Sequence, residues 1–328
     1  MLGLVIALAA VFVLDIMTGP AWLSVSEVFS ALLRSPEADP TNLVIVWLIR
    51  LPVAIMAVVV GASLGLAGGE MQTILDNPLA SPYTLGISAA AGFGAGLALI
   101  VGVGVIPHAE HILVPVNAFV FSMLTSLVIY TLAKIKNASS ETIILSGIAL
   151  LFLFNALNAL LQYHASLEEL QAMVFWLFGS LMKSNWTKVW IAAGVLGLII
   201  PLIIKDTWRL TALRLGDQKA RSLGANVEGL RLKTMIYISI LTAAAVCFVG
   251  TIGFIGLVAP HIARITVGED QRFFFPCSAL GGALLLSGAS VGSKVIVQGA
   301  VYPIGIITAF IGVPFFLSVI LGRRKRYW

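Results

Sequence analysis

Long apolar segments recur from one end of this chain to the other, and they restrict its fold more than any other feature. Hydrophobic residues make up 59% of the 328 residues and charged residues only 11%, whereas an average soluble domain has about 25% charged residues. A soluble core could not enclose so much apolar surface, so we expect lipid to surround the chain. Helices of about 20 apolar residues can cross a bilayer. The apolar runs cover residues 2–17, 44–72, 86–106, 112–133, 142–163, 187–204, 232–251, 253–267, 273–292 and 303–321.

The stretch 232–267 is too long for one span, and Gly250 and Gly253 are positions at which a helix can end. Dividing it there predicts an all-α, polytopic membrane protein of about ten transmembrane helices, with residues 1–328 forming one domain. An even number of spans places both termini on one side. If that side is the cytoplasm, its loops carry 15 of the 20 Lys and Arg residues, including the basic tail Arg323–Arg326. The positive-inside rule therefore favours ten spans and cytoplasmic termini.

Two polar segments on the outer side are not expected to be spans. Residues 22–42 are too polar for lipid, and residues 166–182 mix charged and aromatic side chains as a short amphipathic helix at the outer interface would. The first run lacks the basic start and the cleavage pattern of a signal peptide, so we expect it to remain as a helix. Cys247 and Cys277 lie in apolar runs and are expected to be buried thiols.

The chain lacks motifs for nucleotide binding or hydrolysis. It has no G-x-x-x-x-G-K-[ST] sequence, so we expect no ATP binding of that kind, and it has neither H-E-x-x-H nor G-x-S-x-G. His108 and His111 are expected to belong to a solvated turn rather than to a metal site. The net charge of +5 gathers in loops on one side and does not indicate nucleic acid. Active transport would therefore need a separate ATPase.

The longest cytoplasmic loop, about 205–233, contains a short helix between two spans. Asp217 is expected to cap this helix by accepting backbone N–H bonds, Gln218–Leu223 to form about two turns, and Gly224 to end it in a left-handed conformation. A helix about 10 Å long cannot span a membrane. A capped helix flanked by basic residues suits docking into a groove of another protein, and the alternative is a solvated basic loop.

The fifth run carries three amides, Asn155, Asn158 and Gln162, at offsets of three and four residues, which places them on one helical face. Polar side chains are costly in lipid unless they meet polar partners or water. They could line a wet route, or they could join helices through hydrogen bonds.

Four motifs occur in order: Arg50-Leu51-Pro52, Asn77–Gly86, Leu215–Gly224 and Gly253–Arg264, the last reading GFIGLVAPHIAR. Together they resemble the FecCD family, the membrane permeases of ABC importers for ferric siderophores, haem and vitamin B12. The resemblance runs from about residue 44 to the end. It implies a transport subunit, not an enzyme, in a bacterial cytoplasmic membrane. The implied partners are a cytoplasmic ATPase dimer that binds ATP and magnesium, a second permease subunit, a substrate-binding protein or lipoprotein, and an iron chelate.

The resemblance also implies roles for individual residues. The fifth span would line the translocation route, and the helix in 166–182 would be part of an outer gate. The second basic residue that the family has after Arg-Leu-Pro is Val53 here, and Arg50 and Lys294 remain as candidates for docking the binding protein. Glu70 departs from the family pattern; we expect it to reach the headgroups, with a functional carboxylate as the alternative. Coupling to the ATPase would use Arg214, Leu215, Gly216, Asp217, Lys219, Ala220, Arg221, Leu223 and Gly224, and a cytoplasmic gate would use Asn77, Pro78, Leu79, Ser139, Ser140 and Glu141.

The sequence thus predicts the permease subunit of an ATP-driven importer for iron chelates, with ferric siderophores first and haem or cobalamin as alternatives. A secondary transporter driven by an ion gradient would need a paired acid and base near mid-bilayer, and a zinc or manganese permease would need His and carboxylate ligands along its route. Neither pattern is visible in the sequence.

Overall fold

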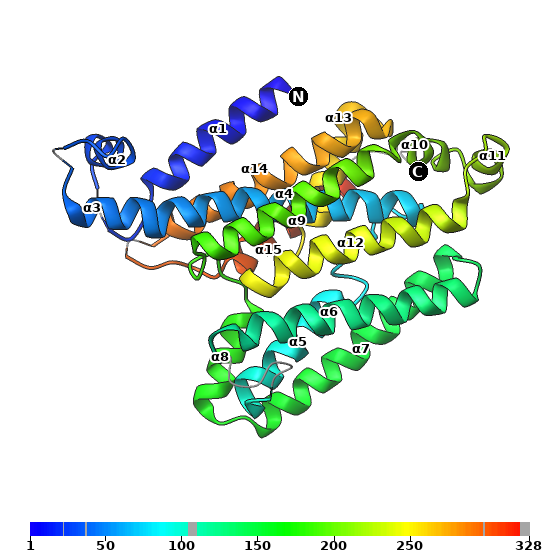
Figure 1. Ribbon diagram of the computed structural model, residues 1–328, viewed down its shortest axis with the longest axis horizontal. Coiled ribbons are helices and arrows are strands. Elements are labelled where there is room, and N and C mark those ends of the chain that lie inside the picture. Colours follow the sequence, from blue (N-terminus) through cyan, green and yellow to red (C-terminus); the bar gives the residue numbers. More distant parts are fainter. Residues whose placement is uncertain (22, 37, 104–109, 298, 322–328) are drawn as a thin grey trace.

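The computed structural model describes residues 1–21, 23–36, 38–103, 110–297 and 299–321, without the side chains of residues 110, 111 and 320. The basic tail and His108 lie outside the described residues, as does the side chain of His111. The described chain is helical throughout, and its long helices run side by side (Figure 1). Helices α2 (Val25–Leu32) and α8 (Leu167–Leu177) lie at one end, called the α8 end below. Helices α10 (Thr207–Leu213) and α11 (Asp217–Ser222) lie at the other, called the α11 end.

Ten apolar helical segments within the described residues correspond to the ten predicted runs. Six are long and apolar enough to cross a membrane, and four are shorter. The long ones are α3–η1–α4 (Pro40–Val44, Ile45–Arg50 and Leu51–Leu75), α6 (Glu110–Ile135), α7 (Ser140–His164), α9 (Trp186–Ile204), α12 (Val227–Val249) and α14 (Gln271–Val295). The shorter ones are α1 (Leu2–Met17), α5–η2 (Ile87–Gly96 and Leu97–Val101), α13 (Ile255–Val267) and α15 (Ile304–Leu321).

The predicted division of the stretch 232–267 is confirmed. Helix α12 ends at Val249, and Gly250 has a φ of +76°, which favours glycine. Helix α13 begins at Ile255. Its second residue, Gly256, packs against the backbone of Leu64 and Gly68, which places the start of α13 next to the middle of α4. Its 13 residues extend about 20 Å. Helix α13 is therefore a half-length helix that starts inside the molecule and ends at the α11 end.

Close packing of α4 against α14 forms the centre of the molecule. A Cβ atom added to Gly61 or Gly65 would overlap a backbone carbonyl of α14, at Gly282 and Ser278 respectively. Small residues four positions apart are a common means of bringing two membrane helices into backbone contact. These glycines therefore fix the position of α4, which carries motif residues at both of its ends.

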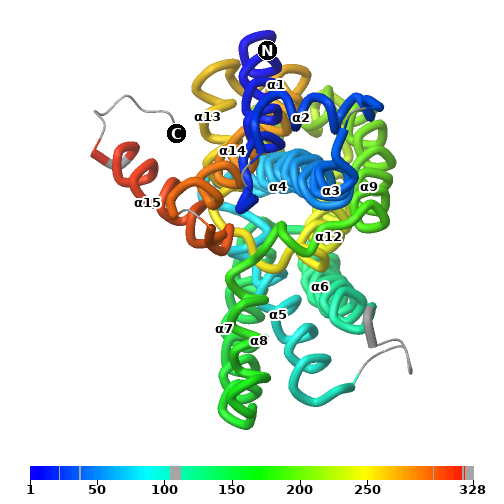
Figure 2. Tube along the Cα trace, turned by 90° about the vertical axis from the view of Figure 1, so that its left-hand side faces the viewer, coloured from blue at the N-terminus to red at the C-terminus, as the bar shows by residue number. Residues whose placement is uncertain are grey.

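The helices divide into two groups that meet along α12. Helices α5 to α8 form a lobe beside the larger group that contains α1, α4, α9 and α13 to α15 (Figure 2). Helix α12 packs against α6 of the lobe and against α4 and α9 of the larger group. One apolar cluster, around Ile74 and Leu241, lies toward the α11 end, and another, around Val60 and Val249, lies toward the α8 end.

The two polar segments predicted to lie outside the spans each hold a short helix. Ser24 and Glu27 form a capping box at the start of α2, and Ser166 and Glu169 form one at the start of α8. The backbone amide and the hydroxyl of Ser166 hold the pKa of Glu169 below its usual value. Cys247 and Cys277 are free and buried, as expected.

Candidate functional site: a charged cluster at the α11 end

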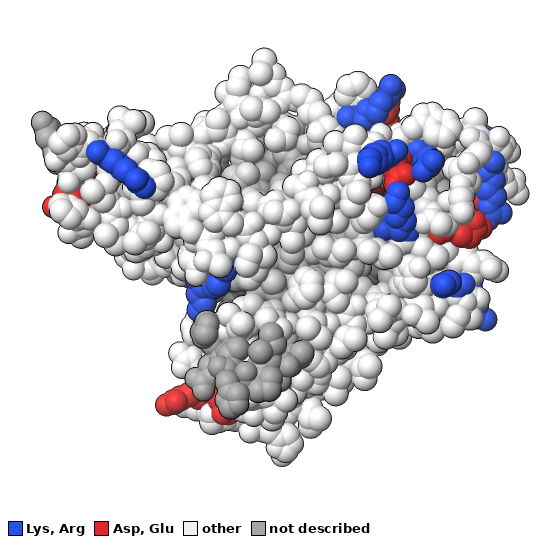
Figure 3. All heavy atoms as spheres, in the orientation of Figure 1, with Lys and Arg blue, Asp and Glu red and all other residues white. Residues whose placement is uncertain are grey.

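Basic side chains gather at the α11 end, over α10, α11 and the start of α12 (Figure 3). Helix α11 carries them on an exposed surface, in which Lys219 and Arg221 lie beside Leu215 and Leu223, 56% and 49% exposed. Ala220 is fully buried and anchors the helix from below. Among the predicted coupling residues, Leu215, Lys219, Arg221 and Leu223 therefore form one exposed tip that mixes apolar and basic side chains.

The expected capping role of Asp217 is wrong. The N-cap of α11 is Gly216, with a φ of +94°, and no side chain caps this helix. The carboxylate of Asp217 instead accepts two hydrogen bonds of 2.9 Å from the guanidinium of Arg231. Gly224 does have the expected left-handed conformation, with a φ of +86°.

Arg231 joins three separate segments. Besides binding Asp217, its Nε donates to the carbonyl of Ile74 at 2.8 Å and its Nη1 to that of Ala138 at 3.4 Å. Its side chain is only 8% exposed. Sequence analysis missed this residue, although a signal was present: Arg231 lies between Leu230 and Leu232 at the start of an apolar run, and a charge in that setting needs partners.

A second ionic group lies next to the first. Arg214 pairs with Asp76, at the end of α4, and with Glu269, between α13 and α14. Arg264, near the end of α13, lies 3.2 Å from Glu269 and donates to Gln72 of α4 at 3.0 Å. Predicted coupling residue Arg214 thus ties the base of α11 to the ends of α4 and α13.

The predicted gate segments flank these groups. Asn77 accepts a hydrogen bond from the amide of Leu79, which stabilises the turn after α4, and Pro78 lies between them. Ser139 caps α7 by accepting from the amide of Thr142; Ser140 and Glu141 form the first turn of that helix. The two segments are connected through Arg231, which binds Ile74, three residues before the first segment, and Ala138, directly before the second.

The three predicted pathway amides differ in their surroundings. Asn155 is exposed, Gln162 is half-buried, and Asn158 is 6% exposed. Asn158 donates to the carbonyl of Ala89 in α5 at 3.0 Å. Asn158 therefore joins two helices through a hydrogen bond, as the second interpretation of these amides expects. The side chains of Asn155 and Gln162 remain accessible to a molecule that lies against α7.

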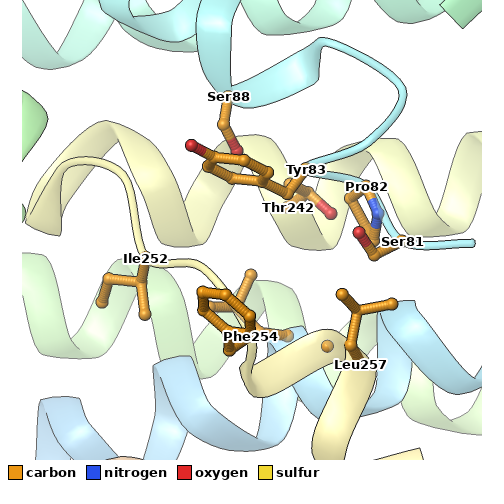
Figure 4. Close-up of a pocket in the computed structure, with 10 residues that line it drawn as sticks. Ser81, Pro82, Tyr83, Ser88, Thr242, Ile252, Phe254 and Leu257 are labelled. Atoms are coloured by element: carbon orange, nitrogen blue, oxygen red, sulfur yellow. The ribbon is translucent and has the colours of Figure 1, made fainter. Parts of the chain in front are cut away.

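Hollows lie around the start of α13 and beneath α8. A cavity of about 10 Å³, the size of one water molecule, separates Ser81, Tyr83 and Ser88 from Phe254 and is shown in Figure 4. A groove of about 300 Å³ is lined by Leu79, Phe254 and residues of α13 and α15. A cavity of about 640 Å³ lies beneath α8, next to the ends of α6 and α12 that lie toward the α8 end.

Comparison with known proteins shows the relationship. A family model described as the FecCD transport family matches residues 7–322. The chain belongs to the FecCD transport family.

Individual relatives agree with this assignment. The FecCD chain is 42% identical, over 93% of its length and 88% of the relative, to the ABC transporter permease protein MJ0087 of Methanocaldococcus jannaschii. It is 36% identical, over 86% and 84%, to the hemin transport system permease protein HmuU of Yersinia pestis. Other matched proteins are named for import of Fe(3+)-citrate or vitamin B12. A solved metal-chelate type ABC transporter in an inward-facing conformation superimposes with a TM-score of 0.85 at 31% identity, over 98% and 97% of the chains.

The FecCD chain uses its two candidate docking cations elsewhere, which corrects that assignment. Arg50 is 4% exposed and donates from Nη1 to the carbonyls of Ile16 at 3.0 Å and Met17 at 2.9 Å, at the end of α1. Lys294 is buried and pairs with Asp15 at 2.7 Å. Both side chains hold α1 in place and are not available on the surface.

The expectation for Glu70 is also corrected. Its side chain does not reach the membrane surface; the residue is 1% exposed, and neither carboxylate oxygen has a hydrogen-bond partner among the described residues. It lies between Gly69 and Met71, in a stretch of α4 in which residues 63–75 are all buried.

Proposed function

We propose that this FecCD chain is the permease subunit of an ATP-driven importer for iron chelates, located in the cytoplasmic membrane with both termini inside. The observation that carries the proposal is α11. A six-residue helix with exposed leucines and cations at its tip has no evident role within this chain, and its shape suits a cleft of a cytoplasmic ATPase. ATP and magnesium would bind that partner.

The ionic groups beneath α11 support coupling. Closure of an ATPase dimer would move α11, and Arg231 and Arg214 connect α11 to the ends of α4, α7 and α13. The segments that we propose as the cytoplasmic gate are the turn after α4 and the start of α7. Movement of one short helix would thus reach both gate segments through hydrogen bonds that are present in this structure.

A second permease subunit would complete the route. The groove at Leu79 and the exposed face of α7 are open in the single chain, and the central cavity at Ser81 is closed to little more than one water molecule. We propose that the route runs along these open surfaces, past Asn155 and Gln162. Amides without charge would let a bulky anionic chelate pass without being held tightly.

Ferric siderophores are the first candidate substrates, and haem and cobalamin follow, since relatives are named for hemin, Fe(3+)-citrate and vitamin B12. The buried pair of Asp15 and Lys294 is an acid and a base within the apolar helices, a feature that the sequence did not reveal. It lies near the ends of α1 and α14 rather than at mid-bilayer, so it does not favour an ion-driven transporter.

The test uses proteoliposomes that contain the permease with its co-purifying ATPase and binding protein. Radiolabelled ferric siderophore, haemin and cobalamin are offered separately, with ATP or with an imposed proton or sodium gradient. We expect that one iron chelate is taken up only when ATP is present on the side of the membrane that carries the ATPase. A non-hydrolysable ATP analogue in place of ATP should stop this uptake. Uptake driven by a gradient without ATP would contradict the proposal.

A further inference from the structure

The guanidinium of Arg231 joins three segments of the molecule. It is buried, and its hydrogen bonds reach α11 through Asp217, the last turn of α4 through Ile74, and the turn before α7 through Ala138. These three segments are distant in sequence. Each of them leads directly into a part of the protein that the proposed function uses.

The chemistry of the site requires arginine. Guanidinium offers five donors in a fixed plane, so one edge can bind a carboxylate with two bonds while Nε points elsewhere. The acceptors are backbone carbonyls where helical pairing stops. Ile74 belongs to the last turn of α4. Ala138 belongs to a turn in which Asn137 and Ala138 both have positive φ, 53° and 52°, a conformation that is unfavourable for residues with a Cβ. Arg231 therefore stabilises a strained turn as well as an ion pair.

Helix α12 carries this contact toward the other face of the molecule. It is 23 residues long, about 35 Å, and has no proline, whereas α6, α9 and α14 each have one inside the helix. At its far end, the carbonyl of Val249 accepts from the amide of Ser180 at 2.7 Å, and the hydroxyl of Thr251 donates to the carbonyl of Leu177. Helix α12 is thus attached to α11 at one end and to the segment after α8 at the other.

We propose that Arg231 is the positioning residue that makes α11, the two gate segments and α12 move as one unit. Arg231 holds α11 through the carboxylate of Asp217. Helix α12 transmits a displacement of α11 to α8. That this movement serves transport rests on the proposed function. The mechanical connection itself can be tested without any partner protein.

The first experiment measures amide hydrogen exchange of the purified full chain in lipid nanodiscs. Losing a bidentate charge-assisted bond should speed exchange about tenfold or more. In Arg231→Met we expect this acceleration both in α11 and in residues 136–139. In Asp217→Asn, which keeps the bonds to Ile74 and Ala138, only α11 should accelerate. The control is Arg272→Gln, an exposed arginine whose pair with Asp270 is local, and it should leave both regions unchanged. Unchanged exchange in Arg231→Met would overturn the inference.

The second experiment exchanges the charges, Asp217→Arg with Arg231→Asp. The swapped pair can hold α11 again, but aspartate at position 231 cannot donate to Ile74 or Ala138. We expect protection of α11 to return while residues 136–139 stay exposed to exchange. In the assembled transporter, chelate uptake should stay about tenfold below wild type while the ATPase remains bound and active. Full recovery of uptake would reduce Arg231 to a simple ion-pair partner and overturn the proposal.

The two proposals fail separately. If wild-type protein showed no ATP-dependent uptake, the proposed function would be contradicted, and the exchange data would still decide whether Arg231 joins the three segments. If uptake needs ATP and exchange in Arg231→Met is unchanged, the function stands and the connection is disproved.

Discussion

The buried charges of Asp15 and Lys294 hold each other although they lie 279 residues apart in the sequence. Asp15 and Lys294 are almost fully buried, with 0% and 3% of their side chains exposed, and the hydroxyl of Ser290 donates to the second oxygen of Asp15 at 3.1 Å. A buried pair of this kind adds little over an apolar replacement, but removing one member leaves the other charge without compensation. The pair therefore makes α1 dependent on α14.

The single variants Lys294→Met and Asp15→Asn are expected to differ in severity. Lys294→Met leaves a buried carboxylate and should cost about 3–5 kcal/mol of stability. Asp15→Asn should cost less because the backbone carbonyl and the amide oxygen at position 15 can both still accept from the ammonium of Lys294. The double variant Asp15→Leu with Lys294→Met should recover most of the loss. Denaturant unfolding in detergent measures these differences, with Lys183→Met, an exposed lysine, as the control. Equal stability of wild type and Lys294→Met would argue against a buried pair.

The sequence located these charges but not what they bind. Arg50, Lys294 and Asp217 were all singled out, and each proved to bind a group on another helix or helix end, 34 residues away for Arg50, 279 for Lys294 and 14 for Asp217. Periodicity reports the neighbours of a residue along its own helix, whereas the partner of a buried charge depends on how helices pack. The same limit explains why Arg231 was overlooked.

At the scale of elements, α7 has two kinds of surface. Asn158 faces α5 and bonds to the carbonyl of Ala89, whereas Asn155 and Leu153 are both exposed in the single chain. An exposed amide next to lipid would be costly. We therefore expect the side of α7 that carries Asn155 to face water and the side that carries Leu153 to face lipid.

Cysteine substitution distinguishes the two surfaces. Because Cys247 and Cys277 are buried, a water-soluble thiol reagent should label Asn155→Cys rapidly and both Leu153→Cys and Asn158→Cys slowly. Asn158→Leu should lower stability by about 0.6 kcal/mol, the average for such bonds between membrane helices, and Asn155→Leu should not. Equal labelling at 153 and 155 would remove Asn155 from the proposed route.

Elements were predicted more accurately than contacts, because hydropathy identifies apolar helices directly. The ten runs match ten helical segments, and the break after α12 falls at Gly250 as expected. Hydropathy could not show how far each helix extends through the molecule. Residues 253–267 were taken as a span, yet α13 starts beside the middle of α4, since an apolar segment reads alike whether lipid or other helices surround it.

For the molecule as a whole, charge distribution defines the two faces. Basic residues cluster over α10 to α12 (Figure 3), and the sequence has 15 of its 20 Lys and Arg residues on the side assigned to the cytoplasm. We therefore expect the α11 end to be cytoplasmic and the α8 end to face outward.

Reporter fusions test this orientation. A reporter that works only outside the cytoplasm should be inactive when fused after Trp328 and active when fused near Glu168 in α8. A reporter that works only inside should give the opposite result, which controls for expression. Activity of the outside reporter after Trp328 would mean that an odd number of helices crosses the membrane and that α13 does not count as a span.

The junction beneath α8 also has a consequence for biosynthesis. The carbonyls of Phe178 and Gly179 accept from the amides of Gly305 and Ile304 at 2.9 and 3.1 Å, and the amide of Ser180 donates to Val249. The ribosome makes residues 178–180 long before it makes α15, so these backbone groups must wait for the last helix to be inserted. A chain whose synthesis stops before α15 would keep these carbonyls of Phe178 and Gly179 without their partners at the α8 end. Quality-control proteases could therefore recognise incomplete copies from this one place.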